Sequence, residues 1–252
     1  MKNEKLVSIL IPVYNRGDLI SETIESAINQ TYENIELIIV DNKSTDNTFK
    51  ICKSYEKKFP DVIKVFQNKK NLGPVINWKE CLRYSKGKYI KFLYSDDQID
   101  KDFIKKTVKI LIENPGIALV FTRVKIYGQV TRDYIFGETG KYSSSEFIEG
   151  ALIGNKLIPV SPSCALFRKK DVEKNLLIDI PNPSNLDFSK YGAGNDLLLF
   201  MFTLREYNYF YYINDSLSFF RAHQGSLTIS KNLKEYYDFS KYYYIYKTNY
   251  IL

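Results

Sequence analysis

The chain has 252 residues, 44% of them hydrophobic and 26% charged, which is typical of a globular protein with one large or two small domains. Lys and Arg outnumber Asp and Glu by 36 to 29, and the net charge of +7 favours anionic partners such as nucleotides or phosphorylated acceptors. The basic residues are scattered and no recognition motif occurs, so we expect no nucleic-acid partner.

Cysteine spacing and hydropathy exclude two further classes. Cys52, Cys81 and Cys164 form no Cys-x-x-Cys pair, which argues against a thiolate zinc site. No apolar run approaches the roughly 18 residues of a membrane-spanning helix. An odd cysteine count without a signal peptide indicates a reducing, cytoplasmic location.

The first half of the chain alternates strand-like and helix-like segments. Strands are predicted over Val7–Val13, Ile35–Val40, Ile63–Phe66, Tyr89–Tyr94 and Ile117–Ile126. Helices are predicted after a capping Asp18, over 46–59, from Pro74, and over 101–113. This alternation predicts an α/β fold, in which a mostly parallel sheet is flanked by helices and ligands bind at the carboxyl ends of the strands.

The second half is less regular. Polar, glycine-containing loops are predicted over 128–145 and 179–195, with a short helix over 145–154 and a strand over 163–167 between them. A helix over 195–207 opens on Asp196. Two short strands, 209–213 and 217–222, are expected around an Asn214-Asp215 turn, and the Tyr-rich tail from Asn232 is expected to be helical.

The adjacent acids Asp96 and Asp97 follow the strand that begins at Tyr89. Neighbouring carboxylates repel each other, and a hard divalent cation relieves that repulsion while also holding a substrate phosphate. The alternative is a solvated Asp-Asp turn. Polar groups also follow the other early strands, at Tyr14-Asn15, Asp41-Asn42 and Asn71-Leu72-Gly73, which favours one shared crevice over unrelated turns.

These segments together resemble the family 2 inverting glycosyltransferases of the GT-A (Rossmann-like) fold. The resemblance covers residues 5–228 and rests on segments that occur in the family's order, namely 8–15, 39–46, 71–73, 87–90, 95–97, 163–168, 195–196 and 221–223. It implies a GT-A domain over 1–228, divided into a nucleotide-sugar half (1–126) and a smaller acceptor half (127–228), and a separate aromatic, basic C-terminal helix over 229–252.

The resemblance also implies roles at a donor site. Pro12 and Tyr14 would flank the nucleoside base, Asp41 would accept a hydrogen bond from the base or ribose, and Asn15 and Asn71 belong to the same site. Asp96 would contact the ribose or donor sugar, and Asp97 would coordinate Mn²⁺ or Mg²⁺ that bridges the diphosphate.

The lone histidine, His223, is implied as a second metal ligand, and Arg221 as a diphosphate contact, because Arg221-Ala222-His223 followed by Ser226 and Thr228 matches a family motif. A satisfied structural histidine and a plain surface arginine are the alternatives.

Asp196 matches the family's catalytic base, which deprotonates the acceptor hydroxyl during an inverting displacement. The alternative is an acid that caps a helix.

The chain departs from the family pattern at three places. Position 94 is Tyr where many relatives have a third acid, Asn195 replaces a Glu, and Ile76 and Asn77 stand where an Arg often follows Asn-x-Gly, so that Lys69 or Lys70 would have to replace it.

The resemblance implies transfer of a sugar from a UDP-, dTDP- or GDP-sugar to a glycan or lipid-linked saccharide, in the synthesis of bacterial surface polysaccharide, lipooligosaccharide or glycoprotein glycans. A non-catalytic homologue and a nucleotidyltransferase are the alternatives. For the tail, packing on the domain or on another subunit is weighed against docking on an anionic membrane at the inner face of the cell.

Overall fold

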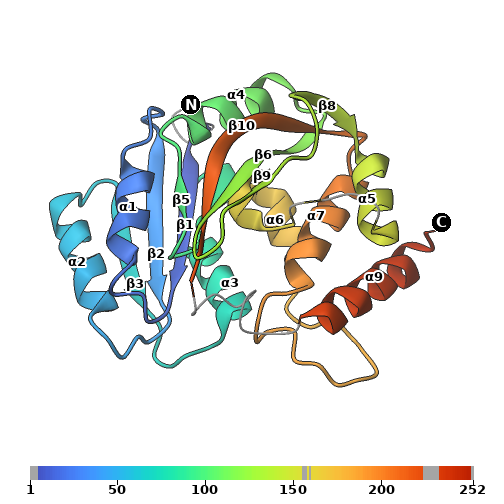
Figure 1. The fold of residues 1–252 in the computed structure, drawn as a ribbon. Coiled ribbons are helices and arrows are strands. Elements are labelled where there is room, and N and C mark those ends of the chain that lie inside the picture. Colours follow the sequence, from blue (N-terminus) through green and yellow to red (C-terminus); the bar gives the residue numbers. More distant parts are fainter. Residues whose placement is uncertain (1–4, 155–157, 159, 224–232, 251–252) are drawn as a thin grey trace.

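A computed structural model describes residues 5–154, 158, 160–223 and 233–250. One sheet, in the order β3-β2-β1-β4-β9-β6-β10-β5, runs through the molecule (Figure 1). Two small strands lie off this path, β7 (Arg132–Tyr134) beside β6 and β8 (Gly140–Ser143) beside β10. Both predicted halves of the chain therefore contribute to the same sheet, and their expected outer boundary at 228 lies outside the described residues.

The first four strands are parallel, as the strand–helix alternation predicts. They are β1 (Val7–Val13), β2 (Ile35–Asp41), β3 (Ile63–Gln67) and β4 (Tyr89–Phe92). Every residue of β1 is buried, because helices cover both faces of the sheet. Side chains of β1 alternate between two cores: Ile9 and Ile11 point into one, and Leu10 points into the other.

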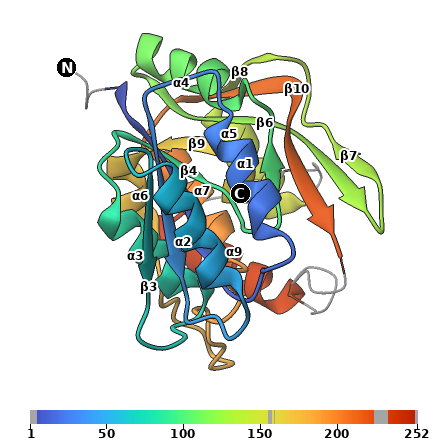
Figure 2. The same cartoon turned by 90° about the vertical axis from the view of Figure 1, so that its left-hand side faces the viewer.

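Helices divide between the two faces. One core receives α1 (Ile20–Ile28), α2 (Thr48–Lys58) and α4 (Phe103–Glu113), and the first two face the viewer in Figure 2. The other core receives α3 (Pro74–Tyr84), α5 (Ser144–Ile153), α6 (Lys169–Asn175) and α7 (Asn195–Arg205). The amphipathic spacing of the sequence thus directs each helix to a face.

Beyond β4 the sheet becomes mixed. β9 (Ala165–Arg168) is antiparallel to both β4 and β6 (Ile117–Gly128), and a 3-10 turn, η2 (Pro162–Cys164), leads into it. β10 (Tyr209–Ala222) is parallel to β6 and antiparallel to the short β5 (Gln98–Ile99). These strands bring residues 221–223 back to the edge where β4 ends.

Three local predictions are wrong. The expected loop at 128–145 contains β7 and β8. Residues 209–222 form one strand, because Asn214 and Asp215 occupy a bulge and Asp215 pairs with Lys106 at 2.7 Å instead of reversing the chain. Asp18 does not cap α1, since the Arg16 carbonyl accepts the first N–H groups of that helix.

The C-terminal helix α9 (Lys234–Thr248) packs on its own domain. Figure 1 places it beside α7, on the side of the molecule away from α1 and α2. Tyr236 and Tyr244 are buried in this contact, whereas Tyr242 and Tyr246 are 68% and 78% exposed. One of the two expectations for the tail, packing on the domain, is therefore met. Within the described ranges, no helix has the length and apolarity needed to cross a bilayer.

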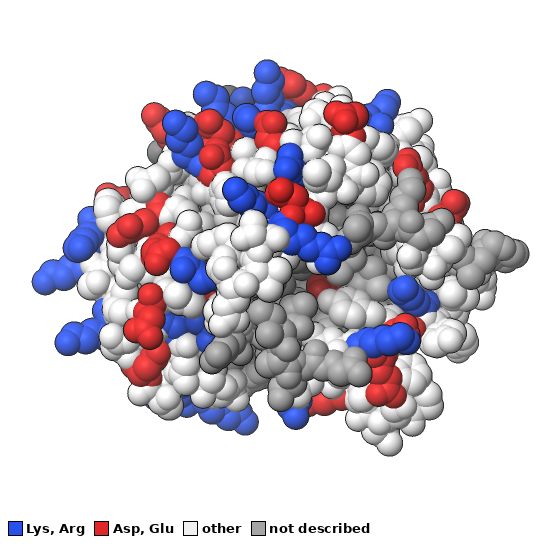
Figure 3. Space-filling model, in the orientation of Figure 1, with Lys and Arg blue, Asp and Glu red and all other residues white. Residues whose placement is uncertain are grey.

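Surface charge is mixed. Figure 3 shows Lys and Arg interspersed with Asp and Glu over the described part of one face. The positive excess therefore forms no continuous patch on this face, in line with the scattered basic residues of the sequence.

Arg168 gives a test of the fold. Its side chain is buried, and Nη2 lies 3.1 to 3.4 Å from the carbonyl oxygens of Leu111, Asn114, Pro115 and Ile117. Arg168→Leu leaves these oxygens unpaired, so we expect the free energy of unfolding in urea to fall by about 3 kcal/mol. Arg83→Leu, at an exposed i,i+3 pair, should leave the urea midpoint near the wild-type value. Equal midpoints for the two variants would contradict this account.

Candidate functional site

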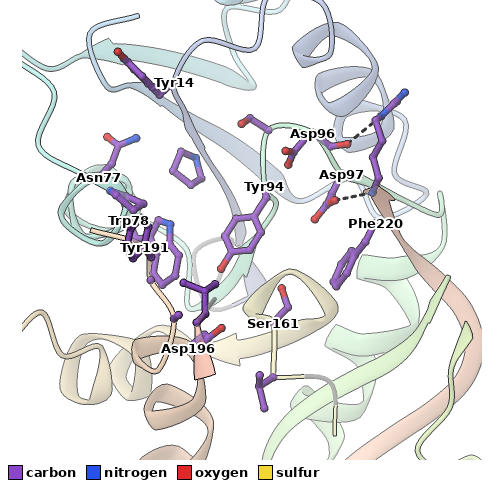
Figure 4. A pocket seen from close by; sticks show the side chains of 18 of the residues that line it. Tyr14, Asn77, Trp78, Tyr94, Asp96, Asp97, Ser161, Tyr191, Asp196 and Phe220 are labelled. Carbon is purple, nitrogen blue, oxygen red and sulfur yellow. Dashed lines mark hydrogen bonds between the residues drawn. The ribbon is translucent and has the colours of Figure 1, made fainter. Parts of the chain in front are cut away.

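A cavity of about 1100 Å³ opens where β1 and β4 end, bounded by the first turns of α3, α7 and α9. Figure 4 shows the side chains that converge on it. Of the predicted site residues, those that line it are Pro12, Tyr14, Asn71, Asp96, Asp97, Asp196 and Arg221. The expected shared crevice therefore exists, although Asn15, Asp41 and His223 are not part of its lining.

Asp97 is a buried carboxylate at the end of β4. It is 6% exposed, and a turn closed by its N–H to the Tyr94 carbonyl at 3.0 Å fixes its position. Burial, together with the charge of Asp96, raises the pKa of Asp97 well above its usual value. The Arg221 N–H at 3.2 Å, the Ser163 hydroxyl and the charge of Lys91 offset part of this effect.

Asp96 turns to the other side and contacts two cationic or ionisable side chains. Its Oδ2 lies 3.3 Å from Arg16 Nε and 2.9 Å from His223 Nε2. The structure thus brings His223 to the acid pair, and it contacts Asp96. The Arg16 contact was not predicted; its only sequence signal is a position two residues after Tyr14 in the loop that follows β1.

Arg221 is held between the acid pair and α1. Its backbone N–H binds Asp97, its Nε donates to the Asp96 carbonyl at 3.3 Å, and its Nη2 pairs with Glu22. The side chain is 19% exposed, so the plain surface charge is not what the structure has. An anion that binds the guanidinium here must compete with Glu22. Ser226 and Thr228, the rest of the expected motif, lie outside the described residues.

The loop after β1 is tied to the loop after β2. Asn15 adopts a positive φ of 50°, and its Oδ1 accepts the Thr45 N–H at 2.8 Å. Asp41 is fully buried and accepts hydrogen bonds from Gln67 Nε2 at 2.8 Å and from the N–H and hydroxyl of Ser44. Both predicted residues shape the loops behind the cavity wall, and Tyr14, 40% exposed, reaches the wall itself.

Asparagine side chains form the wall at the start of α3. Asn71 Oδ1 accepts from Asn42 Nδ2 and from the Gly73 N–H, both at 2.9 Å. Asn77, where an Arg was expected, is 2% exposed, donates to the Val40 carbonyl at 3.0 Å and accepts from Asn68 at 2.9 Å. Position 77 therefore holds a buried neutral amide that pairs with its neighbours.

Asp196 lies in the first turn of α7, after Gly194. Its Oδ1 accepts the N–H groups of Gly194 at 2.9 Å and Leu197 at 2.7 Å, so it satisfies backbone donors at this helix end. Its Oδ2 accepts the Tyr237 hydroxyl at 2.9 Å. Burial outweighs these hydrogen bonds and raises the pKa of Asp196 to about 7.

Tyr94 stands between the two acidic groups (Figure 4). Its ring stacks on Trp78, with centroids 5.6 Å apart and planes 22° apart. Burial, and then the charge of Asp196, raises the pKa of Tyr94 well above its usual value, with Asp97 adding to the effect. Tyr94, which departs from the family pattern, therefore lines the cavity and presents an aromatic ring there.

Lys91 is a fully buried basic residue whose charge acts on Asp97. Its Nζ donates to the Ser163 carbonyl and lies 3.8 Å from the centroid of the Phe103 ring. Burial lowers the pKa of Lys91 to about 7, against the opposing effect of Asp97. A charged residue inside the apolar strand at 89–92 was the signal for this feature, and sequence reasoning missed it.

The acid pair has the chemistry of a divalent-metal site that is only partly built by protein. Two adjacent carboxylates suit Mg²⁺ or Mn²⁺, and burial together with the charge of Asp96 makes ionisation of Asp97 costly without a nearby cation. In the described part of the chain, no three acidic, Cys or His groups lie close enough to hold an ion alone. An ion here would share its coordination with phosphate oxygens and water, which is common for Mg²⁺.

The raised pKa of Asp196 has a consequence for stability. Its value rises from 3.8 to about 7, so the native state keeps a proton that the unfolded chain releases between these pH values. Stability from this group is present below about pH 3.8 and is lost as pH rises through 7. Asp196→Asn removes the loss, so its stability relative to wild type should increase from pH 4 to pH 7 by urea unfolding. Asp215→Asn controls for deleting one exposed acid, and parallel curves for wild type and Asp196→Asn would refute the effect.

Known relatives are similar over part of their length. The chain is 36% identical to the poly(ribitol-phosphate) beta-glucosyltransferase of Bacillus spizizenii over 135 residues, which is 53% of this chain and 21% of the relative. It is 31% identical to the minor teichoic acid biosynthesis protein GgaB of Bacillus subtilis over 174 residues, 68% of this chain and 19% of that protein. The chain thus spans about a fifth of these two relatives.

Solved structures share the fold. Residues 1–349 of S. aureus TarS, in complex with UDP-GlcNAc, match 98% of this chain and 67% of that one, with a TM-score of 0.77 and 22% identity. The mannosyltransferase PcManGT from Pyrobaculum calidifontis, in complex with GDP-Man and Mn²⁺, matches 87% and 58%, with a TM-score of 0.56 and 17% identity. These likenesses confirm the expected α/β, GT-A architecture.

A family model described as glycosyl transferase family 2 matches residues 8–176, which is more than half of the chain. The match runs from β1 to α6 and includes the acid pair. The resemblance seen in the sequence is thereby confirmed, and the chain belongs to glycosyl transferase family 2.

Proposed function

We propose that this protein transfers a sugar from a nucleotide diphosphate donor to a hydroxyl group of a glycan acceptor, with inversion at the anomeric carbon. The observation that carries the proposal is the pairing of two unlike acid sites in one cavity. Asp96 and Asp97 lie among Arg16, His223 and Arg221, whereas Asp196 lies across Tyr94 and, among the residues that the structure describes, has no cation beside it. The first site suits the binding of a diphosphate, and the carboxylate of the second site suits the acceptance of a proton.

The donor occupies the wall made by β1, β4 and the start of α3. Tyr14 and Pro12 would cover the flat face of the base, and Asn71 would offer amide groups to its polar edge. Asp41 and Asn15 would contribute to this site from behind the cavity wall. Asp41 would do so by fixing the loop at Ser44. Complexes of fold relatives with UDP-GlcNAc and with GDP-Man support a nucleotide-sugar donor.

A divalent cation, Mn²⁺ or Mg²⁺, would neutralise the charge that develops on the departing diphosphate. Asp97 would hold it, with His223 as a second ligand and Asp96 toward the ribose or donor sugar. The fold relative in complex with GDP-Man and Mn²⁺ supports a divalent cation as part of the donor site. Arg16 would balance the negative charge of Asp96. Arg221 would contact the diphosphate once Glu22 is displaced.

Asp196 would act as the general base. The acceptor hydroxyl gives its proton to the carboxylate while its oxygen forms the new bond to the anomeric carbon. The bond between that carbon and the diphosphate oxygen breaks, and its electron pair leaves with the nucleoside diphosphate. A pKa of about 7 keeps a large ionised fraction at neutral pH and still makes Asp196 a competent proton acceptor.

The acceptor enters beside the aromatic side chains. Trp78, Tyr94 and Tyr191 line the cavity near Asp196 and offer flat faces on which sugar rings can pack. The names of the relatives, one acting on poly(ribitol-phosphate) and one in minor teichoic acid biosynthesis, support an acceptor in a bacterial surface polysaccharide. A lipid-linked acceptor would place the protein at the inner face of the plasma membrane, with or without contact from α9.

Two alternatives remain for comparison. A non-catalytic homologue would account for Tyr94 and Asn195, but both Asp97 and Asp196 keep their places at the cavity. A nucleotidyltransferase would need a glycine-rich, basic phosphate loop after β1, where this chain has Tyr14-Asn15-Arg16-Gly17.

Donor binding can be tested by thermal shift with UDP-, dTDP- and GDP-sugars in Mn²⁺, Mg²⁺ or EDTA. Binding to the native state raises the melting temperature by mass action, so we expect a cation-dependent rise of a few degrees with one nucleotide class. Asp97→Ala should abolish the dependence on cation. Asp133→Ala, at a surface ion pair outside the cavity, is the control. The absence of a shift with every nucleotide would favour the non-catalytic alternative.

The base assignment can be tested by turnover. Asp196→Asn keeps the size of the side chain but removes its proton affinity, so kcat should fall by about 10²-fold or more. The thermal shift with donor should persist, because the donor wall is intact. Turnover at the wild-type rate would refute Asp196 as the base.

A further inference from the structure

The C-terminal helix reaches into the active-site cavity through Tyr237. This residue lies one turn into α9 and lines the cavity, and its hydroxyl donates to Asp196 Oδ2 at 2.9 Å. The two residues are 41 positions apart in the chain. No family motif of the sequence extends to this helix, so its contribution to the site is a property of this fold.

Close packing fixes α9 against the segment that carries Asp196. A Cβ atom on Gly194 would lie 2.2 Å from Ser240 Oγ and 2.8 Å from the Tyr236 carbonyl oxygen, so the two backbones meet where only glycine fits. Gly194 also has a φ of 84°, which favours glycine. The Tyr236 ring makes edge contacts with Phe188 and Tyr191 on the loop before α7.

Hydrogen bonds leave one oxygen of Asp196 with room for a further donor. Oδ1 already accepts two backbone N–H groups, whereas Oδ2 accepts only the Tyr237 hydroxyl among the described residues. A carboxylate oxygen has two lone pairs, so the second lone pair of Oδ2 can accept a proton. The hydrogen bond from the Tyr237 hydroxyl therefore fixes the direction in which the free lone pair of Oδ2 points.

We propose that Tyr237 is a positioning residue for the general base, and that α9 is therefore a working part of the acceptor site. The proposal rests on the assignment of Asp196 as the base. In the transfer, the proton of the acceptor hydroxyl passes to Oδ2 of Asp196, and Tyr237 keeps its own proton while its hydrogen bond stabilises the ionised carboxylate.

The titratable groups that face Asp196 determine how removal of the Tyr237 hydroxyl changes the pKa of Asp196. Tyr94, from the segment after β4, and Tyr237, from α9, interact electrostatically with it, and both have pKa values raised well above the usual range. Both therefore remain neutral at the pH values of an assay. The hydrogen bond from Tyr237 lowers the pKa of Asp196, so its removal must raise that pKa above about 7.

The test compares the pH profiles of kcat/KM for wild type, Tyr237→Phe and Tyr244→Phe. Tyr244 is a matched control, since it is fully buried on the same helix and its hydroxyl has no hydrogen-bond partner among the described residues. For Tyr237→Phe we expect the acidic limb to move up by about one pH unit. Activity should then be about tenfold below wild type at acidic pH, and the gap should narrow at alkaline pH. Donor-induced thermal shifts should equal those of wild type.

Two results would overturn the proposal. One is a Tyr237→Phe profile that overlays those of wild type and Tyr244→Phe. The other is an equal loss at every pH together with a lower melting temperature, which is the mark of a purely structural role. Asp196→Asn run in parallel separates the two levels: wild-type turnover there removes the base assignment, and with it this proposal, whereas loss of turnover leaves the Tyr237 result to decide.

Discussion

The removal of carboxylates from water in one cavity is the constraint on which the rest of this structure depends. Asp97 is buried and Asp196 is partly buried there, and the loss of hydration raises the pKa of each. The two sites are compensated differently. Asp97 has a second acid beside it and the basic group of Lys91 near it, whereas Asp196 accepts hydrogen bonds from two N–H groups and a tyrosine and has no cationic partner among the described residues. In the proposed function, that difference assigns the cation and the diphosphate to the first site and the acceptor's proton to the second.

The fold delivers these groups from distant parts of the chain. The acid pair follows β4, and β10, through its pairing with β5, brings Arg221 and the following His223 to the same edge. Asp196, in the first turn of α7, lies on the opposite side of Tyr94. The C-terminal helix then packs against Gly194, directly before α7, where a Cβ atom would collide with Ser240 and Tyr236. Each element therefore has a position that the site needs, and the hydrophobic cores on the two faces of the sheet hold those positions.

Local sequence patterns predicted β1 to β4, β6, most helices and the acids that follow β4, because continuous apolar runs and the residues that end them are determined by neighbours in the chain. The short strands β5, β7 and β8 were missed, because their residues form no such run. Contacts between distant segments could not be predicted in this way. Arg16 meets Asp96 across 80 positions and Tyr237 meets Asp196 across 41, and nothing within either segment specifies the partner. Asp41 and Asn15 were placed in the right loops, but the direction of their side chains depends on Ser44 and Thr45. The bulge at Asn214 was mistaken for a turn because both use the same polar residues.

In the proposed reaction the sugar is transferred in a single displacement, with the acceptor oxygen entering on the Asp196 side and the diphosphate leaving on the Asp97 side. Proton NMR of the anomeric signal during turnover of an α-linked nucleotide sugar distinguishes this reaction from one that retains configuration. We expect the first product formed to have the β configuration, with a large coupling constant for a gluco-configured sugar. An α-configured product would contradict the single displacement and the role given to Asp196.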